Sequence, residues 1–193
     1  MRPTLCIDVD STLWDTGAWV RAAVLEITGD NLDLGKVTTW THVLDAYGEE
    51  TTTLVFDRVF DPARIRERGP YAGAPEALRA LQEDLDIGIH FVTHNDPEKM
   101  TPHLRPWLEA HFGLDAGLTV TIGNKLEVIE KLGAFGLIDD KPDTIERVAD
   151  ANLWAATKIQ PWNRDLVARR SDIYGFHHWQ EVYGLLLLRM LED

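Results

Sequence analysis

Short apolar runs alternate with segments of helical periodicity along most of this 193-residue chain. Short apolar runs bounded by turn residues indicate buried strands, and apolar positions at helical spacing indicate amphipathic helices. Strands that alternate with helices form mainly parallel sheets with helices on both faces, so we predict a three-layer α/β fold. We expect strands at 4–9, 87–93, 117–122, 134–139 and 152–157, and helices at 75–86, 97–112, 125–132, 142–150 and 177–191.

One long segment after the first strand does not follow this alternation. We predict two helices there, at about 18–28 and 49–60, joined by a threonine-rich connection. We interpret residues 15–70 as a small helical cap inserted after the first strand, and residues 1–14 and 71–193 as the core domain. An insertion at this point lies over one edge of the sheet, where it can act as a lid. The aromatic side chains from position 14 onward either form the core of the cap or contact a substrate: Trp14, Trp19, Trp40, Tyr47, Phe56 and Phe60.

Two carboxylates, Asp8 and Asp10, follow the first strand directly. Residues at positions i and i+2 of an extended chain share a face, so we expect both side chains in one small volume. Such a pair needs a bound cation, or one ionised and one protonated group. A second pair, Asp139 and Asp140, ends a later apolar run. Ligands of parallel sheets bind beyond the carboxyl ends of the strands, so the four acids predict a Mg²⁺ site there.

Composition and charge narrow the class of protein. With 45% hydrophobic and 26% charged residues, and no apolar run long enough to cross a bilayer, we expect a cytoplasmic protein without a membrane partner. No signal-peptide pattern precedes the first strand. We interpret the single cysteine, Cys6, as a small buried apolar residue, which fits a reducing compartment. The net charge of −13 argues against a stable nucleic-acid complex, which needs a basic surface. The oligomeric state stays open, with a homodimer as one option.

Four short motifs occur in order along the chain: Asp8-Val-Asp10-Ser-Thr12, Phe91-Val-Thr93, Lys125 and Leu137-Ile-Asp139-Asp140. Together they resemble the four motifs of the haloacid dehalogenase-like phosphohydrolase superfamily, which implies a Rossmann-like core. Within that superfamily the chain is most similar to the 5'(3')-deoxyribonucleotidase family and its bacterial and phage relatives. This closer similarity rests on Gly73-Ala74 before the helix that follows the cap, on Asn124-Lys125, on Gln160 to Arg164 and on Gly175 to Glu181.

The resemblance implies a Mg²⁺-dependent phosphomonoesterase that forms an aspartyl-phosphate. Asp8 would be the nucleophile, and Asp10 would be the general acid and then the general base. The ligands of Mg²⁺ would be Asp8, the backbone carbonyl of Asp10, and Asp139. Asp140 would act through water or support the other ligands.

The resemblance also implies a phosphate-binding set. Thr93 and Lys125 would bind the oxygens of the transferring phosphoryl group. Thr93 could instead be an ordinary strand residue, and Lys141 is an alternative to Lys125. Residues 160–164 either close one side of the pocket or only anchor a loop. The further candidates for contact with phosphate or substrate at this edge are Ser11, Thr12, His94 and Asn95.

Our leading hypothesis for the function is hydrolysis of nucleoside monophosphates, with deoxyribonucleotides favoured and cap aromatics stacking on the base. Alternatives keep the chemistry and change the substrate to a sugar phosphate, another small metabolite or a polynucleotide 3'-phosphate end. A non-catalytic phosphoryl-binding module is a third hypothesis. Dehalogenases of this superfamily lack the acid that matches Asp10, and phosphonate cleavage uses a cap lysine, for which Lys36 is the only candidate, so we disfavour both.

Overall fold

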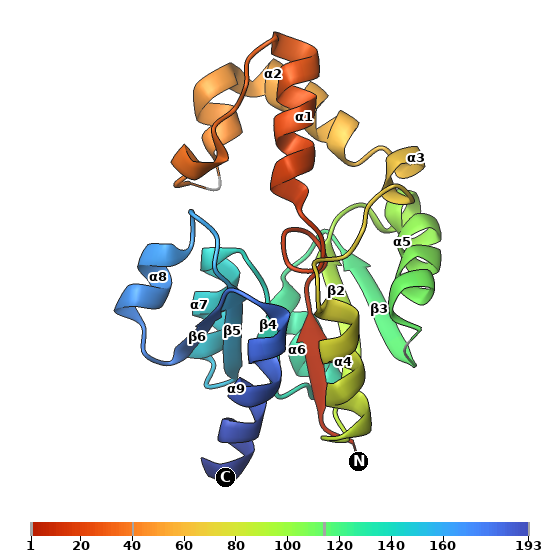
Figure 1. Cartoon of the computed structure of the whole chain (residues 1–193), viewed down its shortest axis with the longest axis vertical. Coiled ribbons are helices and arrows are strands. Elements are labelled where there is room, and N and C mark those ends of the chain that lie inside the picture. The colour runs from red at the N-terminus through yellow and green to blue at the C-terminus, as the bar shows by residue number, and fades with distance from the viewer. Residues whose placement is uncertain (1, 40, 114, 193) are drawn as a thin grey trace.

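The computed structural model describes residues 2–39, 41–113 and 115–192, which contain one six-stranded parallel sheet (Figure 1). Its strands are β1 (Thr4–Ile7), β2 (Gly88–His94), β3 (Ala116–Thr121), β4 (Gly136–Ile138), β5 (Trp154–Lys158) and β6 (Ile173–Phe176). They lie in the order β3-β2-β1-β4-β5-β6, and every neighbouring pair is parallel. The predicted α/β class with a parallel sheet is therefore confirmed.

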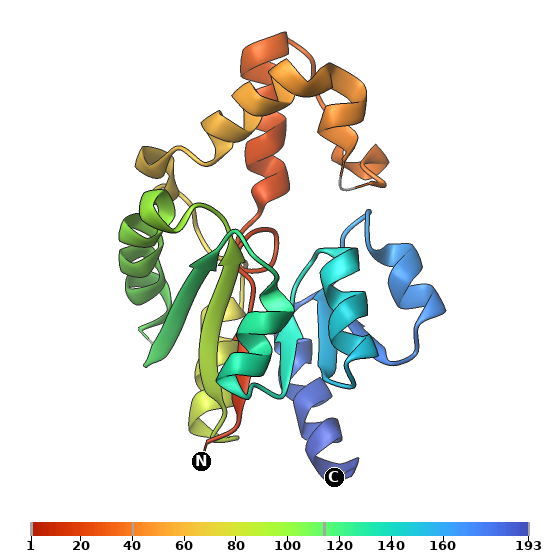
Figure 2. The same cartoon turned by 180° about the vertical axis from the view of Figure 1, so that it is seen from behind.

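Helices cover both faces of this sheet (Figures 1 and 2). One face carries α4 (Ala74–Glu83), α5 (Pro97–Phe112) and α9 (Trp179–Glu192), and the other carries α6 (Lys125–Leu132), α7 (Pro142–Asp150) and α8 (Arg164–Arg169). Successive side chains of β1 point to opposite faces of the sheet. Leu5 and Ile7 therefore belong to the apolar cluster under α4, α5 and α9, and Cys6 belongs to the cluster under α6, α7 and α8. In the described ranges, none of the helices combines the length and the apolar character that a membrane span requires.

A helical layer stands above the carboxyl ends of the strands (Figure 1). It consists of α1 (Thr16–Thr28), the short 3₁₀ helix η1 (Leu34–Lys36), α2 (His42–Val59) and α3 (Pro62–Ile65). Val20 and Val24 of α1 belong with Val55 and Val59 of α2 to a buried apolar cluster separate from the two clusters of the sheet. The second helix begins earlier than predicted, because its chain continues through a kink at Gly48, whose φ of 78° suits glycine.

The sequence analysis missed two short elements near the C-terminus, α8 and β6. They have six and four residues, too few for a hydrophobic period to emerge. The polar residues between these two elements, Arg170 to Asp172, have the composition of a loop. Pairing with β5 makes β6 a strand, with Ala155 opposite Ile173, and that long-range contact is not visible in the local pattern.

Gly136→Ala is expected to destabilise the contact between β4 and β5. A Cβ at this position would meet the backbone oxygen of Trp154, and that oxygen cannot move without shifting the strand pair. We expect the free energy of unfolding in urea to fall by about 1–3 kcal/mol. Gly184→Ala in α9 is the control, because a Cβ there meets nothing within 4 Å, and it should add about 0.5–1 kcal/mol. A Gly136→Ala protein as stable as the parent would contradict this account.

Candidate active site

The carboxyl ends of β1 and β4 lie side by side at the point where the strand order reverses. The chain places β2 and β3 on one side of β1, and β5 and β6 beyond β4, so a crevice opens between the two central strands. Ile7 pairs in register with Ile138, and the N–H of Asp8 donates to the carbonyl of Ile138 at 2.8 Å. Because the register matches, the acids that follow the two strands meet at one place.

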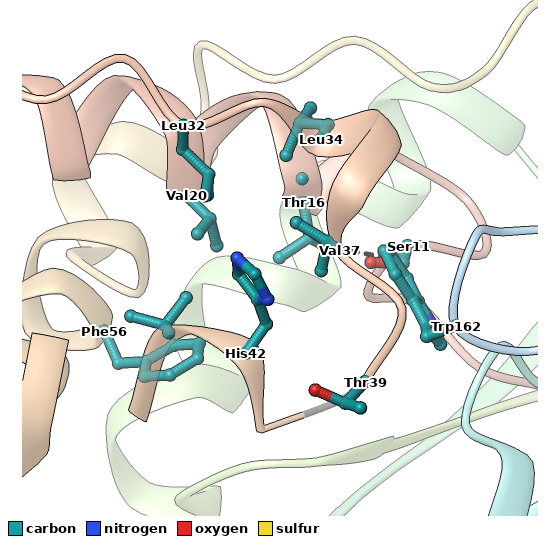
Figure 3. A pocket seen from close by; sticks show the side chains of 12 residues that line it. Ser11, Thr16, Val20, Leu32, Leu34, Val37, Thr39, His42, Phe56 and Trp162 are labelled. Carbon is teal, nitrogen blue, oxygen red and sulfur yellow. Dashed lines mark hydrogen bonds between the residues drawn. The ribbon is translucent and has the colours of Figure 1, made fainter. Parts of the chain in front are cut away.

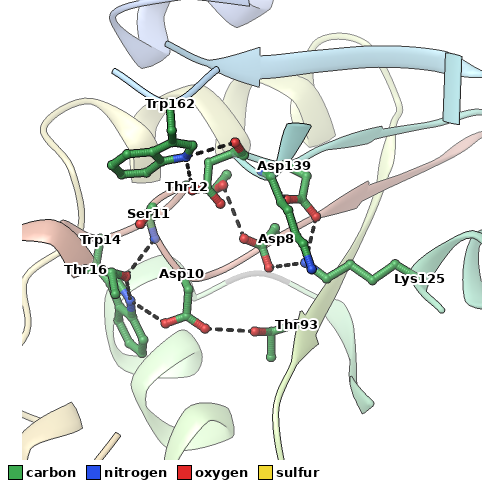
Figure 4. A network of polar contacts seen from close by, with 12 residues as sticks. Asp8, Asp10, Ser11, Thr12, Trp14, Thr16, Thr93, Lys125, Asp139 and Trp162 are labelled. Carbon is green, nitrogen blue, oxygen red and sulfur yellow. Dashed lines mark hydrogen bonds and ion pairs between the residues drawn. The ribbon is translucent and has the colours of Figure 1, made fainter. Parts of the chain in front are cut away.

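Asp8, Asp139 and Asp140 form a buried carboxylate cluster. The Lys125 ammonium lies beside Asp8 and Asp139 of this cluster (Figure 4). The Nζ of Lys125 lies 2.5 Å from Oδ1 of Asp8 and 2.6 Å from Oδ2 of Asp139. Lys125 is the first residue of α6, which begins at this edge of the sheet. Lys141, the alternative lysine, contacts the cluster through its backbone N–H, which donates to Oδ1 of Asp139 at 2.8 Å. The structure therefore brings Lys125, and not the Lys141 side chain, against the acids.

This donor set fits a cation that prefers oxygen ligands. One carboxylate oxygen from each of Asp8, Asp139 and Asp140 lies within 4.8 Å of the others, and no second group of this kind occurs in the described ranges. Carboxylates are the protein ligands that Mg²⁺ prefers. Three buried acids face one ammonium, so a further positive charge would be stabilised there. The residues present are thus suited to Mg²⁺.

Burial and mutual repulsion oppose full ionisation of the cluster. Burial raises the pKa of Asp8 to about 8, although Lys125 acts in the opposite direction. Burial, followed by the charge of Asp139, holds the pKa of Asp140 well above its ordinary value. Burial alone would lower the pKa of Lys125, but the charges of Asp139 and Asp8 outweigh it and raise that pKa. A divalent cation would favour the ionised forms of these acids.

The carboxylate of Asp10 points away from this cluster (Figure 4). Its Oδ1 accepts a hydrogen bond from Nε1 of Trp14 and its Oδ2 accepts one from Oγ1 of Thr93, both at 3.0 Å. The guanidinium of Arg68 lies 4.0 Å from Oδ1. Burial raises the pKa of Asp10, and Arg68 opposes that rise. The expectation that the Asp8 and Asp10 side chains share one face of an extended chain is therefore wrong. The strand β1 ends at Ile7, so the chain is no longer extended at Asp10, and the Asp10 carboxylate lies outside the candidate metal group.

The turn after Asp8 is held by side-chain hydrogen bonds. Ser11 has a φ of 56°, and its N–H donates to Oγ1 of Thr16 at 2.8 Å. Oγ1 of Thr12 donates to Oδ2 of Asp8 at 3.4 Å. The carbonyl of Thr12 accepts a hydrogen bond from Nε1 of Trp179 at 3.1 Å. The hydroxyl of Thr12 thus lies beside the proposed nucleophile, while the N–H of Ser11 is already engaged.

The loop after β5 fixes the position of Asp140. Nε1 of Trp162 donates to Oδ2 of Asp140 at 3.0 Å. Asn163 is fully buried, and its Nδ2 donates to the carbonyl of Asp140 at 3.0 Å and to Oγ1 of Thr157 at 2.9 Å. Residues 160–164 were expected either to close one side of the pocket or only to anchor a loop. The structure is compatible with both roles, because Asn163 anchors the loop and Trp162 lies at the site.

A pocket of about 60 Å³ opens between the helical layer and this edge of the sheet (Figure 3). Its surface is largely apolar, and most of the residues that line it belong to α1, η1 and α2. Phe56 of α2 and Trp162 supply the aromatic rings, and His42 at the start of α2 turns its imidazole into the space. Ser11 links this pocket to the carboxylate cluster, since it belongs to the turn that follows Asp8.

The predicted aromatic residues are placed differently from one another. Trp14 is fully buried and packs edge-on against Trp107 with ring centroids 4.5 Å apart, which does not fit contact with a substrate. Trp19 is half-buried and lies over Arg68. Tyr47 donates its hydroxyl to Asp30 at 2.7 Å, within the helical layer. Trp40 lies outside the described residues.

His94 and Asn95 follow Thr93 at the same edge but outside the buried cluster. The side chain of His94 is exposed. Oδ1 of Asn95 accepts the backbone N–H of Asp96 at 3.0 Å, a contact that stabilises the start of α5. In the part of the chain that the structure describes, neither side chain is hydrogen-bonded to the carboxylates, so contact with phosphate or substrate stays a prediction for both.

Sequence reasoning missed Arg68 and did not single out Phe56, Trp162 or His42. Arg68 lies in a charged run that begins at Arg64 and reads as a solvated face, yet it is 1% exposed. Nothing in that run separates Arg68 from its neighbours. Phe56 was one of six aromatics between positions 14 and 60, and only the packed structure shows that it reaches the pocket.

Comparison with known proteins supports the fold assignment. No protein-family model matches the chain, and no curated protein matches its sequence. Similar solved structures include a haloacid dehalogenase-like family hydrolase from Xanthomonas campestris, with 16% identity, a TM-score of 0.65 and coverage of 96% of this chain and 95% of that chain. A putative phosphatase from Clostridium difficile shows 14% identity, a TM-score of 0.66 and coverage of 95% and 97%. D,D-heptose 1,7-bisphosphate phosphatase from Burkholderia thailandensis shows 9% identity, a TM-score of 0.56 and coverage of 96% and 98%.

These similarities establish the architecture. The chain has the Rossmann-like α/β fold of the haloacid dehalogenase-like hydrolases, and its solved structural neighbours include hydrolases named as members of that superfamily and a putative phosphatase. The match extends over nearly the full length of both chains, including the helical layer after β1.

Lys125→Met is expected to leave Asp8 and Asp139 buried without their counter-charge. With divalent cations chelated, we expect the free energy of unfolding to fall by about 3–5 kcal/mol, because an uncompensated buried charge is costly. Saturating Mg²⁺ should restore about 2–3 kcal/mol, since a ligand that binds only the folded state stabilises it.

Urea unfolding in EDTA and in Mg²⁺ measures both effects. Lys131→Met is the control, because this exposed lysine lies on the same helix and should change stability by no more than about 0.5 kcal/mol. Equal stability of Lys125→Met and the parent protein in EDTA would contradict the assigned role of the ammonium.

Proposed function

We propose that this protein is a Mg²⁺-dependent phosphomonoesterase that acts through an aspartyl-phosphate. The observation that best supports it is the position of Asp8 at the end of β1, against Lys125 and two further acids, with Asp10 held nearby by a different set of contacts. Two acids in different environments are suited to different catalytic roles. The names of two structural neighbours, both phosphatases, agree with this chemistry.

Asp8 is the nucleophile in this proposal. Its carboxylate oxygen forms a bond to phosphorus, the bond from phosphorus to the leaving oxygen breaks, and Asp10 gives that oxygen a proton. A water molecule then attacks phosphorus and passes a proton to Asp10. The bond between phosphorus and Asp8 breaks, inorganic phosphate departs, and both acids return to their starting forms.

Asp8, Asp139 and the backbone carbonyl of Asp10 would hold the Mg²⁺ ion, with Asp140 acting directly or through water. The bound ion supplies positive charge that offsets repulsion between these acids and a phosphate dianion. Trp162 supports the arrangement by holding the carboxylate of Asp140 in one orientation.

Lys125 and Thr93 would bind the transferring phosphoryl group. An ammonium has three N–H donors, and the contacts to Asp8 and Asp139 use two of them. Thr93 is buried at the end of β2, and its hydroxyl would turn from Asp10 to a phosphoryl oxygen. Further contacts are proposed from Ser11, Thr12 and His94, which lie at the same edge of the sheet.

The substrate proposed is a nucleoside monophosphate, with a deoxyribonucleotide favoured. The rings of Phe56 and Trp162, in a pocket with a largely apolar wall, are the surfaces on which a nucleobase would stack. At about 60 Å³ the pocket is smaller than a base, so it would have to widen to admit one. A sugar phosphate is the second candidate, because one structural neighbour is named a heptose bisphosphate phosphatase and because Thr39 and His42 offer polar groups in the same pocket. The net charge of −13 disfavours a polynucleotide end.

Residues 15–70 are proposed to act as a cap that closes over the core of residues 1–14 and 71–193. The pocket between the two parts would then enclose the leaving group and exclude water during the first step. The partner is a small phosphorylated molecule rather than a nucleic acid or a membrane. The lone buried Cys6 is compatible with the cytoplasm, which we propose as the compartment.

Phosphate release from a panel of nucleoside monophosphates and sugar phosphates tests this function. We expect release in Mg²⁺, none above background in EDTA, and a loss of at least about 10³-fold in Asp8→Asn, because an amide cannot act as the nucleophile. Asp84→Asn is the control, since this exposed acid ends α4 at the opposite edge of the sheet and should retain full activity. Turnover that survives both EDTA and Asp8→Asn would exclude the proposed chemistry.

Phe56→Ala tests the choice of substrate. If the ring stacks on a base, KM for the best nucleotide should rise about tenfold, while hydrolysis of a small sugar phosphate should change little. Leu54→Ala on the same helix is the control, because that side chain is 51% exposed and does not line the pocket. A rise in KM of equal size for nucleotides and sugar phosphates would reject base stacking.

A further inference from the structure

Arg68 is a buried arginine on the segment that returns from the helical layer to the core. It is 1% exposed, although arginine rarely is so deeply buried. One nitrogen of its guanidinium, NH2, donates to the carbonyl of Val59 at the end of α2. The other two nitrogens, Nε and NH1, are buried without a hydrogen-bond partner in the described part of the chain. A buried charge of this kind needs compensation from elsewhere.

Aromatic rings supply part of that compensation. The guanidinium carbon lies 4.5 Å from the ring centroid of Trp14, 5.2 Å from that of Trp19 and 6.0 Å from that of Phe60. Such contacts stabilise a cation and fix the plane of the guanidinium. They bring together residues from both sides of the helical layer, since Trp19 lies on α1 and Phe60 follows α2.

The remaining compensation comes from Asp10. NH1 of Arg68 lies 4.0 Å from Oδ1 of Asp10, and in the described ranges this is the ion pair that Asp10 makes. The two direct hydrogen bonds to Asp10 come from Trp14 and Thr93, which are neutral donors. Trp14 therefore contacts both partners, since its indole N–H binds Asp10 and its ring faces Arg68.

We propose that Arg68 is a positioning residue, whose buried guanidinium holds the Asp10 carboxylate beside Trp14 and Thr93 by charge compensation. The catalytic part of this inference rests on the proposed function, in which Asp10 gives up its proton in the first step. The guanidinium would stabilise the carboxylate charge that develops as this proton leaves. Arg68 itself does not reach a ligand, because its side chain has no exposed surface. An arginine that only filled space would contribute through packing alone, and an arginine that bound substrate would change KM.

A double-mutant cycle on stability tests the pairing without any assay of activity. Urea unfolding in EDTA would compare the parent protein with Arg68→Met, with Asp10→Asn and with the double variant. We expect Arg68→Met to reduce the folding equilibrium constant at least about tenfold more in the parent than in the Asp10→Asn background. Ile65→Ala is the matched control, because this buried side chain of α3 makes no ion pair and its effect should be the same in both backgrounds. Additive effects of Arg68→Met and Asp10→Asn would overturn the proposal.

The cycle still decides the question if Arg68→Met alone does not fold. Folding of the double variant would then reveal the same coupling in an extreme form, because removal of the Asp10 charge would have rescued the protein. Failure of both the single and the double variant to fold would overturn the proposal, since the loss would not depend on Asp10.

Leaving-group dependence tests the catalytic consequence. With thymidine 5'-monophosphate, whose leaving alkoxide needs a proton, Arg68→Met should lower the rate of the first step about 10–100-fold with KM unchanged. With p-nitrophenyl phosphate, whose leaving group needs no proton, the burst rate should change by no more than about threefold. Arg68→Lys, which keeps the charge, should recover part of the loss, and Ile65→Ala should affect both substrates equally.

An equal loss with both substrates, or a rise in KM, would overturn the positioning role. Failure of the proposed function gives a different result, because the parent protein would then release no phosphate from either compound. In that case the stability cycle still decides whether Arg68 is paired with Asp10.

Discussion

Lys125 places one ammonium between two carboxylates that end adjacent parallel strands, Asp8 after β1 and Asp139 after β4. Two buried carboxylates at that edge would otherwise repel each other, and they would favour either protonation or separation of the strand ends. The ammonium lets β1 and β4 stay in register up to the residues that carry the acids. It also leaves a deficit of positive charge, because Asp140 belongs to the same cluster, and that deficit makes the site suitable for a divalent cation.

The two acids of the first motif are compensated from different parts of the molecule. Asp8 is paired with Lys125 of a core helix, whereas Asp10 faces Arg68 on the segment returning from the helical layer. The end of β1 at Ile7 and the turn at Ser11 allow this divergence, because the chain is no longer extended where Asp10 lies. Neighbouring residues with the same chemistry can therefore hold different protonation preferences and serve different steps. The counter-charge of Asp8 thus comes from a helix packed on the sheet, and that of Asp10 comes from the segment below the helical layer.

The amino-acid sequence was sufficient to predict the parallel sheet, most core helices and the meeting of Asp8 with Asp139 and Asp140, but not the separate position of the Asp10 carboxylate. Apolar strands followed at once by acids are local features, and the geometry of parallel sheets brings their carboxyl ends together. The sequence was not sufficient to predict α8, which is short, or β6, which is short and forms by pairing with β5. Nor did it predict Arg68, whose burial depends on rings far apart in the chain, or the placement of Trp14, which tertiary packing assigns to the core. The general lesson is that charge compensation by distant residues leaves no local pattern.

The central position of β1 has a consequence for biosynthesis. Its neighbours in the sheet begin at Gly88 and Gly136, and the ammonium that pairs with Asp8 lies 117 residues further along the chain. At a synthesis rate of about 5–20 residues per second, roughly 6–23 s pass between the emergence of Asp8 and that of Lys125 from the ribosome. During this interval the apolar strand Thr4–Ile7 has one edge or both without a partner, while the helices α1 to α3 can already form. The nascent chain therefore has to shield its first strand until β4, which ends at Ile138, has been made.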